Sequence, residues 1–233
     1  MTTAPSPPVL IITARGSTEP ASGSRLLTPI AQTIAQRYPG DVRILSLAYP
    51  ATFTRFDPTF PARIDLGPSP AIGVRNLVAA LHDQAATRPE QRIVLLGWSQ
   101  GAQVITDTLA APHHRRAGHD APALNRTAAR LVHAVALFGN PTFTAGQPHN
   151  AGEYAPGVSG VTPHHAGALE KFTDRIRDYC TLTDIAAQNA PGSDVDGRAA
   201  YFHNGMPDQS ADFVLDQLSR TPSSSHKKAH RSG

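Results

Sequence analysis

Cysteine, long apolar runs and aromatic residues are all scarce in this sequence. Cys180 is the only cysteine among 233 residues, so the chain cannot form an intramolecular disulfide. No run of about 18 apolar residues occurs, and we therefore expect no transmembrane segment. Residues 1–8 have neither the basic segment nor the apolar segment of a secretory signal peptide. These absences give no support for an oxidising compartment or for a membrane-embedded protein.

Histidine is more frequent, with 11 residues, but its spacing is not that of a metal site. The histidine pairs at 113–114 and 164–165 lie in segments rich in proline, glycine and alanine, without the ligand spacing of a zinc site. We therefore expect no metal ion and no cofactor.

The excess of basic charge is confined to the C-terminal end. The formal net charge is +3, and residues 221–233 contain Lys227, Lys228 and Arg231 but no acidic residue, which accounts for the whole excess. The rest of the chain is close to neutral, which argues against a nucleic-acid partner, because such proteins gather basic residues on one folded face. We expect residues 220–233 to be a disordered basic tail; weak contact with a polyanion or the cell envelope is the alternative.

Apolar runs and helical periodicities alternate along the chain. A short apolar run predicts a buried strand at residues 9–13, and further strands are predicted at 42–48, 92–96, 131–138 and 174–180. Apolar residues at helical spacing predict helices after residue 26, around 72–81, at 102–109 and at 211–218. The alternation predicts a single α/β domain at residues 9–219, after a flexible N-terminus at 1–8, with a mainly parallel central sheet and helices on both faces. Ligands of such sheets bind beyond the carboxyl ends of the strands.

The most informative motif is Gly97-Trp98-Ser99-Gln100-Gly101, which follows an apolar run and precedes an apolar stretch at helical spacing. A strand, a sharp turn with a central serine and a helix are typical of α/β-hydrolase-type enzymes, in which the serine lies on a strained turn. The two glycines lack the Cβ atoms that would clash where the strand and the helix pack closely. The motif predicts that Ser99 is a catalytic nucleophile. The alternative is an ordinary turn in which Ser99 caps the helix.

A nucleophilic serine needs a base and a group that orients the base, and in this fold the chain order is serine, acid, histidine. Asp184 is the preferred acid, because it lies on the loop expected after the strand at 174–180. His203 is the preferred base, because it precedes the closing helix and follows Asp184. The other acids in this region are Asp178 within the strand and Asp194 and Asp196 in a Gly/Ser-rich linker, and the other late histidines are His226 and His230 in the tail.

The negatively charged oxygen of an acyl-transfer intermediate needs two or more preorganised hydrogen-bond donors. The backbone N–H of Gln100, next to the nucleophile, is one candidate donor. Ser17, in the loop after the first strand, is the other, because it offers a backbone N–H and a hydroxyl. The alternative is that Ser17 and Thr18 only cap the helix that follows.

Together these motifs resemble those of the cutinase family of serine esterases. The matching segments are Ala14-Arg-Gly-Ser-Thr-Glu19, residues 97–101, Phe138-Gly-Asn-Pro141, Cys180-x-x-x-Asp184, and His203 followed by a helix. The resemblance implies an α/β hydrolase without a lid domain, a triad of Ser99, Asp184 and His203, and an oxyanion hole of Ser17 and Gln100. The sequence departs from the family at Ala187, which stands where the second cysteine of a disulfide is usual. We expect Cys180 to be buried and unpaired.

A weaker resemblance, carried by Gly139-Asn-Pro141 and Arg177-Asp-Tyr179, is to the phage lysin B esterases, which cut mycolic acid from arabinogalactan. The expected function is hydrolysis of carboxylic esters, from lipids, polyesters or other acyl esters, through an acyl-enzyme intermediate. A mycolyl-arabinogalactan or other cell-envelope esterase is the runner-up. Acyl transfer and a non-catalytic lipid-binding module are further alternatives. The resemblance implies an extracellular protein, whereas the lack of a signal peptide and of paired cysteines favours the cytoplasm. The sequence does not determine the acyl-chain length of the substrate or the oligomeric state.

Overall fold

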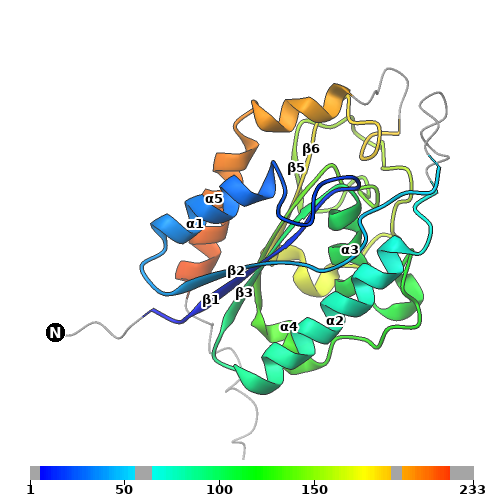
Figure 1. Ribbon diagram of the computed structural model, residues 1–233. Helices are drawn as coiled ribbons and strands as arrows, with labels where there is room; N and C mark the ends of the chain where they lie inside the picture. Colours follow the sequence, from blue (N-terminus) through cyan, green and yellow to red (C-terminus); the bar gives the residue numbers. More distant parts are fainter. Residues whose placement is uncertain (1–5, 56–64, 190–195, 221–233) are drawn as a thin grey trace, which may run out of the picture.

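Six parallel strands form one sheet at the centre of the computed structural model (Figure 1), which describes residues 6–55, 65–189 and 196–220. The strands are β1 Val9–Ala14, β2 Val42–Ser46, β3 Arg92–Trp98, β4 Val132–Phe138, β5 Asn150–Gly152 and β6 Ile176–Cys180. Their order across the sheet is β2-β1-β3-β4-β6-β5, and every pairing between them is parallel. The predicted α/β class with a parallel sheet is confirmed. Most of the expected N-terminal segment 1–8 and of the tail 220–233 lies outside the described residues.

Helices cover both faces of the sheet (Figure 1). α1 Leu27–Arg37 and α5 Met206–Ser219 pack on one face, and α2 Ser69–Thr87, α3 Gln100–Leu109 and α4 Arg126–Leu131 pack on the other. Short 3-10 helices occur at Pro112–His114, Glu170–Arg175 and Asp196–Phe202. All of β1 and nearly all of β3 are buried, which explains their uninterrupted apolar runs. None of the described helices is both long and apolar enough to cross a bilayer.

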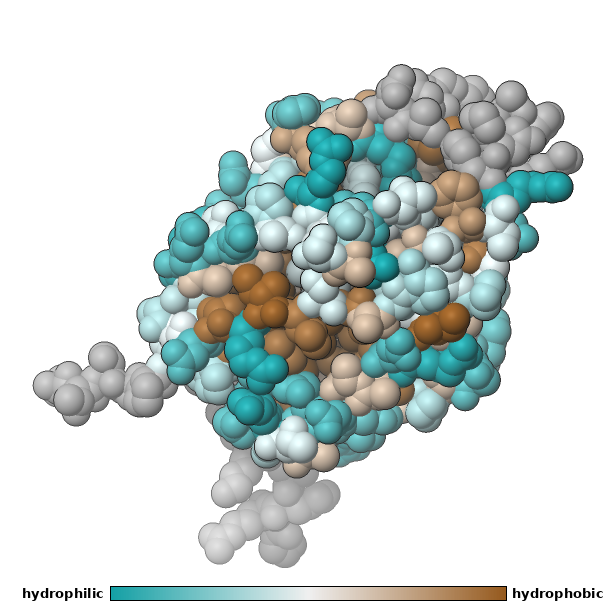
Figure 2. Space-filling view, viewed as in Figure 1, coloured by the Kyte–Doolittle hydropathy of each residue, from teal (hydrophilic) through white to brown (hydrophobic). Residues whose placement is uncertain are grey.

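The edge strand β2 is much more exposed than the central strands. Ile44 and Leu45 keep 43% and 41% of their surface accessible. Figure 2 shows apolar side chains gathered in the middle of the view, over the strand that Figure 1 labels β2. The strand predicted at 42–48 is therefore present as β2, at the edge of the sheet and with most of its side chains exposed.

The sequence pattern does not predict α4 or β5. α4 ends at Leu131, where we expected a strand to begin, and Asn125 caps it by accepting the backbone N–H of Ala128 at 2.8 Å. β5 has only three residues and no apolar run; it is a strand because it pairs with β6. α2 and α5 begin earlier than their apolar residues indicate, since each has a proline in its first turn, where proline suits a helix.

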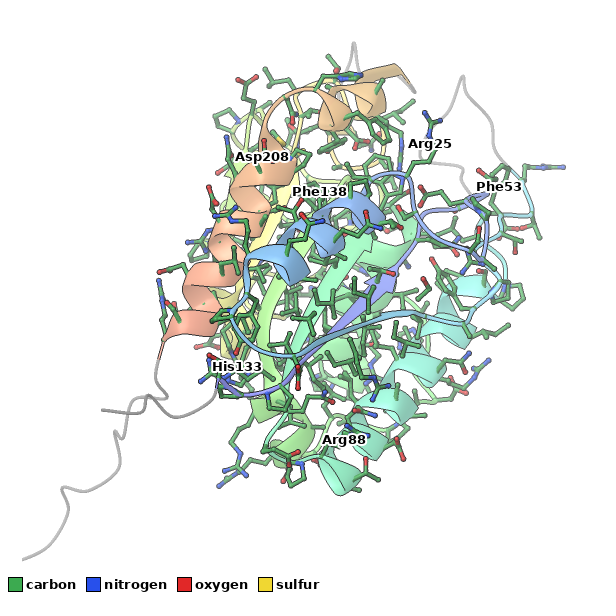
Figure 3. The ribbon with its side chains drawn as sticks, turned by 60° about the vertical axis from the view of Figure 1, so that its left-hand side comes forward. Arg25, Phe53, Arg88, His133, Phe138 and Asp208 are labelled. Carbon is green, nitrogen blue, oxygen red and sulfur yellow. The ribbon has the colours of Figure 1, made fainter. Side chains whose placement is uncertain are left out.

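The carboxyl ends of the central strands lie level with one another. Ala14 of β1 pairs with Gly97 of β3, and Trp98 of β3 pairs with Phe138 of β4. Figure 3 shows β4 running from His133 to Phe138, toward the end of the molecule that carries Arg25 and Phe53. The loops after β1, β2, β3, β4 and β6 therefore meet at this end, which is where ligands of parallel sheets bind.

Candidate active site

Ser99 occupies the sharp turn between β3 and α3. Its backbone has φ 56° and ψ −119°, a left-handed conformation that non-glycine residues rarely adopt and that costs about 1–3 kcal/mol. The turn is so tight that no residue with a Cβ atom fits at the two glycines that flank it. A Cβ on Gly97 would lie 2.7 Å from Ala102 Cα, and one on Gly101 would collide with the Ala14 carbonyl oxygen. The strained turn that the motif predicts is therefore present. The Ser99 side chain makes no capping bond to α3, so the helix-cap alternative has no support.

Ser99 lines a pocket of about 440 Å³ at the carboxyl ends of the strands. The polar and charged residues of its lining are Ser17, Thr18, Glu19, Arg25, Ser99, Gln100, Gln103, Thr162 and Arg198. The apolar part comes from several loops and contains Phe53, Leu66, Trp98, Val161, Ile185 and Phe202. Most of the surface of this pocket is apolar, which suits a ligand with an apolar group.

The structure brings the two predicted oxyanion donors together. Gln100 begins α3, directly after the nucleophile, and its side-chain Nε2 donates to Ser17 Oγ at 3.1 Å. The cap alternative for Ser17 is wrong, because α1 begins only at Leu27, whose N–H is accepted by the hydroxyl of Ser24 at 3.2 Å. Ser17 lines the pocket instead.

Arg15 and Glu19, which belong to the segment Ala14–Glu19, hold the Ser17 loop in shape. The Glu19 carboxylate accepts the N–H of Gly16 at 2.8 Å and the Ser24 hydroxyl at 3.0 Å. The Arg15 guanidinium donates to the Glu19 carbonyl at 2.9 Å and to the Tyr49 carbonyl at 2.7 Å. These bonds fix the backbone on both sides of Ser17. A charged pair flanking Gly-Ser-Thr is the sequence signal for this arrangement.

Asp184 lies on the loop after β6 and is fully buried. Its Oδ1 accepts the N–H of Ala186 at 2.8 Å, and the Arg198 guanidinium lies 3.9 Å from it. Its Oδ2 has no hydrogen-bond partner among the described residues. The next two residues, Ile185 and Ala186, line the pocket. The acid therefore sits immediately behind the pocket wall, with Oδ1 fixed by a backbone N–H and the Tyr201 side chain next to the carboxylate.

The alternative acids differ from Asp184 in their surroundings. Asp178 lies within β6, where Asn140 Nδ2 donates to it at 2.8 Å, and burial raises the pKa of this carboxyl to about 7. It lines a separate small cavity with His149 and His164, not the pocket of Ser99. Asp194 lies outside the described residues, and Asp196 begins a 3-10 helix. Among the described acids, Asp184 fits the predicted place best.

His203 is not joined to the other predicted triad residues in this structure. It follows the 3-10 helix Asp196–Phe202 and is exposed, and its backbone N–H donates to the Ala200 carbonyl at 3.0 Å. Its neighbour Phe202 lines the pocket, but within the described residues no hydrogen bond links the His203 ring to Ser99 or Asp184. His226 and His230 lie outside the described residues. The roles of Asp184 and His203 therefore stay predictions.

The Asp184 loop is held by packing in place of a disulfide. Cys180 is free and buried, as expected, and burial raises the pKa of its thiol. Cys180 and Ala187 form a small apolar cluster with Phe143, so the position of the usual second cysteine is filled by close packing. The buried Tyr201 hydroxyl adds a hydrogen bond, since it accepts the N–H of Thr181 at 3.1 Å.

Known proteins share this sequence pattern and fold. The family described as Cutinase matches residues 5–218. A cutinase from Kineococcus radiotolerans is 31% identical over 142 residues, which cover 61% of this chain and 42% of that protein. The chain spans about half the length of the first curated relatives that it matches.

Two solved structures show the same fold. The catalytic core domain of acetyl xylan esterase from Trichoderma reesei has a TM-score of 0.72 at 23% identity, covering 91% of this chain and 98% of that chain. Lysin B from Mycobacteriophage D29 has a TM-score of 0.55 at 18% identity, covering 91% of this chain and 89% of that chain. At these identities the likeness concerns the fold alone. The family match spans nearly the whole described domain, and the chain therefore belongs to the cutinase family.

Proposed function

We propose that this chain is a serine esterase that hydrolyses carboxylic esters through an acyl-enzyme on Ser99. The observation that carries the proposal is a serine at positive φ that shares one pocket with two donor-bearing residues, Ser17 and Gln100. A serine held on such a turn projects its hydroxyl from the end of the sheet. The two donors can form hydrogen bonds with a tetrahedral oxyanion, which stabilise it. Membership of the cutinase family supports the same chemistry.

In the proposed reaction, His203 takes the proton of Ser99 as Oγ attacks the ester carbonyl, and it returns that proton to the leaving alcohol. Water then attacks the acyl-enzyme with His203 as the base, which releases the acid and restores Ser99. Asp184 orients His203 through Oδ2, the carboxylate oxygen without a hydrogen-bond partner in the described part of the chain. Because His203 is exposed in this structure, the reaction requires the segment after Phe202 to bring its ring within about 3 Å of Ser99 Oγ and Asp184 Oδ2.

We propose an apolar acyl group, longer than acetyl, as the preferred acyl donor. The pocket that Ser99 lines has a mostly apolar surface, to which the side chains of Phe53, Leu66 and Ile185 contribute. Burial of a longer chain against them stabilises the complex by about 0.8 kcal/mol for each buried CH₂. Relatives named acetylxylan esterase point to acetyl esters as a second candidate, and a mycolyl or other cell-envelope ester stays a third.

The test is a series of p-nitrophenyl esters from acetyl to palmitoyl, together with a mycolyl-type substrate, on the wild type and on Ser99→Ala. We expect kcat/KM to rise beyond the acetyl ester, and Ser99→Ala to lose about 10⁴–10⁶-fold of the rate. Ser210→Ala, which removes a buried hydroxyl of α5, serves as the matched control and should keep the wild-type rate.

Other outcomes distinguish the alternatives. If only the acetyl ester is turned over, the preferred substrate is an acetyl ester and not an ester of a longer apolar acid. If only the mycolyl substrate is turned over, the chain is a cell-envelope esterase. A folded wild type that turns over none of these esters, or a Ser99→Ala protein with more than a tenth of the wild-type rate, would overturn the proposed function.

A further inference from the structure

Ser69, the first residue of α2, is linked to the proposed oxyanion donors through its side chain. It is 1% exposed, and its hydroxyl donates to Gln100 Oε1 at 2.7 Å and accepts the backbone N–H of Thr52 at 3.2 Å. Neither bond is made to the backbone of α2. The Ser69 hydroxyl therefore links Thr52, in the loop after β2, to Gln100 of α3, and it does not cap its own helix.

The two ends of the Gln100 amide have complementary partners. Oε1 accepts the Ser69 hydroxyl, while Nε2 donates to the Thr52 carbonyl at 2.8 Å and to Ser17 Oγ at 3.1 Å. Gln100 itself is 1% exposed, so water cannot substitute for these partners. A rotation of the amide by 180° would set Oε1 against the Thr52 carbonyl, two acceptors facing each other. The Thr52 carbonyl therefore selects the one orientation in which Nε2 faces Ser17, and the Ser69 hydroxyl stabilises that orientation by donating to Oε1.

This orientation decides where the Ser17 proton can point. A hydroxyl has one donor and two acceptor sites, and Nε2 of Gln100 occupies an acceptor site of Ser17 Oγ. The Ser17 O–H is thus turned away from Gln100 and is available to the pocket that Ser17 lines with Ser99. We infer that Ser69 is a positioning residue of the oxyanion hole, which holds the Gln100 amide and through it directs the Ser17 hydroxyl toward the developing oxyanion. This inference rests on the proposed function.

The loop beside Ser69 has other anchors, which separates this role from a general structural one. The N–H of Thr18 donates to the Ala51 carbonyl at 2.8 Å, and the N–H of Thr54 donates to the Asp65 carbonyl at 2.8 Å. These bonds flank Phe53, which lines the apolar side of the pocket. Loss of the Ser69 hydroxyl should therefore leave the acyl wall in place and change kcat much more than KM.

The experiment compares Ser69→Ala, Ser69→Thr and Ser17→Ala, alone and combined, with a butyrate ester as substrate and with active sites counted by a serine-directed phosphonate. We expect Ser69→Ala to lower kcat about tenfold, less than the ~10²–10³-fold cost of deleting a donor itself, with KM within about twofold of the wild type. Ser69→Thr keeps a hydroxyl and should recover most of kcat. In the Ser17→Ala background, Ser69→Ala should have little further effect, because both act on the same donor.

Several results would overturn the inference. They are an unchanged kcat in folded Ser69→Ala, an undiminished effect of Ser69→Ala in the Ser17→Ala background, or the same loss in the control Ser210→Ala. Should Ser69→Ala fail to fold, Gln100→Leu breaks the same chain of bonds while keeping the backbone N–H, and it should give at least the same loss of kcat; an unchanged kcat would count against the inference equally. Failure of the proposed function is distinct, since it would appear as an inactive wild type or an active Ser99→Ala.

Discussion

Gly139, at the end of β4, leaves the space in which Oδ2 of Asp184 lies. Its φ is +55°, and a Cβ placed on it would lie 2.5 Å from Asp184 Oδ2 and 3.1 Å from Trp98 Cζ3. Ordinary contact begins near 3.4 Å, so in Gly139→Ala the carboxylate must retreat by about 0.9 Å. Asp184 is fully buried and has little room to do so.

Two costs are expected in Gly139→Ala. An alanine in the left-handed region destabilises the fold by about 1–2 kcal/mol, and the forced displacement of buried neighbours adds about 1–3 kcal/mol. The free energy of unfolding should therefore fall by about 2–5 kcal/mol. A displacement near 1 Å in a catalytic arrangement can cost about 10²-fold, so kcat should fall by roughly that factor if Asp184 orients the base.

Gly146→Ala provides the matched control, because Gly146 has a similar φ of +72° but nothing within 4 Å of the added Cβ. It should lose only the backbone part, about 1–2 kcal/mol, and keep the wild-type kcat. Urea unfolding measures the stabilities, and initial rates on a butyrate ester measure kcat. Equal losses of stability in the two variants, with kcat unchanged in both, would refute the reasoning and with it the assignment of Asp184.

Four further outcomes are expected. His203→Ala should lose about 10⁴-fold of the esterase rate, whereas His164→Ala, which removes a buried histidine outside the pocket, should remain active; the reverse pattern would displace His203 as the base. Ser17→Ala should lower kcat about 10²–10³-fold with a much smaller change in KM, and loss of thermal stability alone would contradict its role as a donor. Because Cys180 is buried and free, dithiothreitol should alter neither the melting temperature nor the activity, and a disulfide-linked active dimer on a non-reducing gel would refute this. Because burial raises the pKa of Asp178 to about 7, the folded state binds its proton more tightly than the unfolded chain, so stability should fall as the pH rises from about 4 to about 7. Each pKa unit is worth about 1.4 kcal/mol, and Asp178→Asn should flatten this slope in urea unfolding at pH 5 and 8.

The parts of the site that follow from local sequence are predicted well. A buried run, a glycine-flanked serine and a helical pattern suffice to place Ser99 on a strained turn. Parallel strands with level ends then bring the Ser17 loop to the same edge, whatever the details of packing. Because the loop after β6 also lies at this edge, the strand pattern predicts that Asp184 lies there. In the structure Asp184 is buried directly behind the pocket wall.

Features that depend on contacts between distant loops could not be predicted. Ser69 and Gln100 are 31 positions apart and become partners only when α2 and α3 pack together. The contact between Gly139 and Asp184 is likewise set by the packing of two loops, and no periodicity encodes it. The surroundings of the His203 ring are likewise set by tertiary structure, in which the Phe202 ring centroid lies 6.4 Å from that of His203. β5 was missed because its partner, not its composition, makes it a strand.

The strained backbone conformation of Ser99 lowers the thermal stability of the fold, while the proposed turnover requires a serine at this position. Its φ of 56° and ψ of −119° form a conformation that glycine adopts without a steric penalty. Ser99→Gly would relieve about 1–3 kcal/mol of backbone strain while removing the proposed nucleophile. Selection for heat resistance alone would therefore drive this position toward glycine, whereas the proposed catalytic role requires the serine. Efforts to stabilise this protein for use should leave the turn untouched and seek their gains elsewhere in the chain.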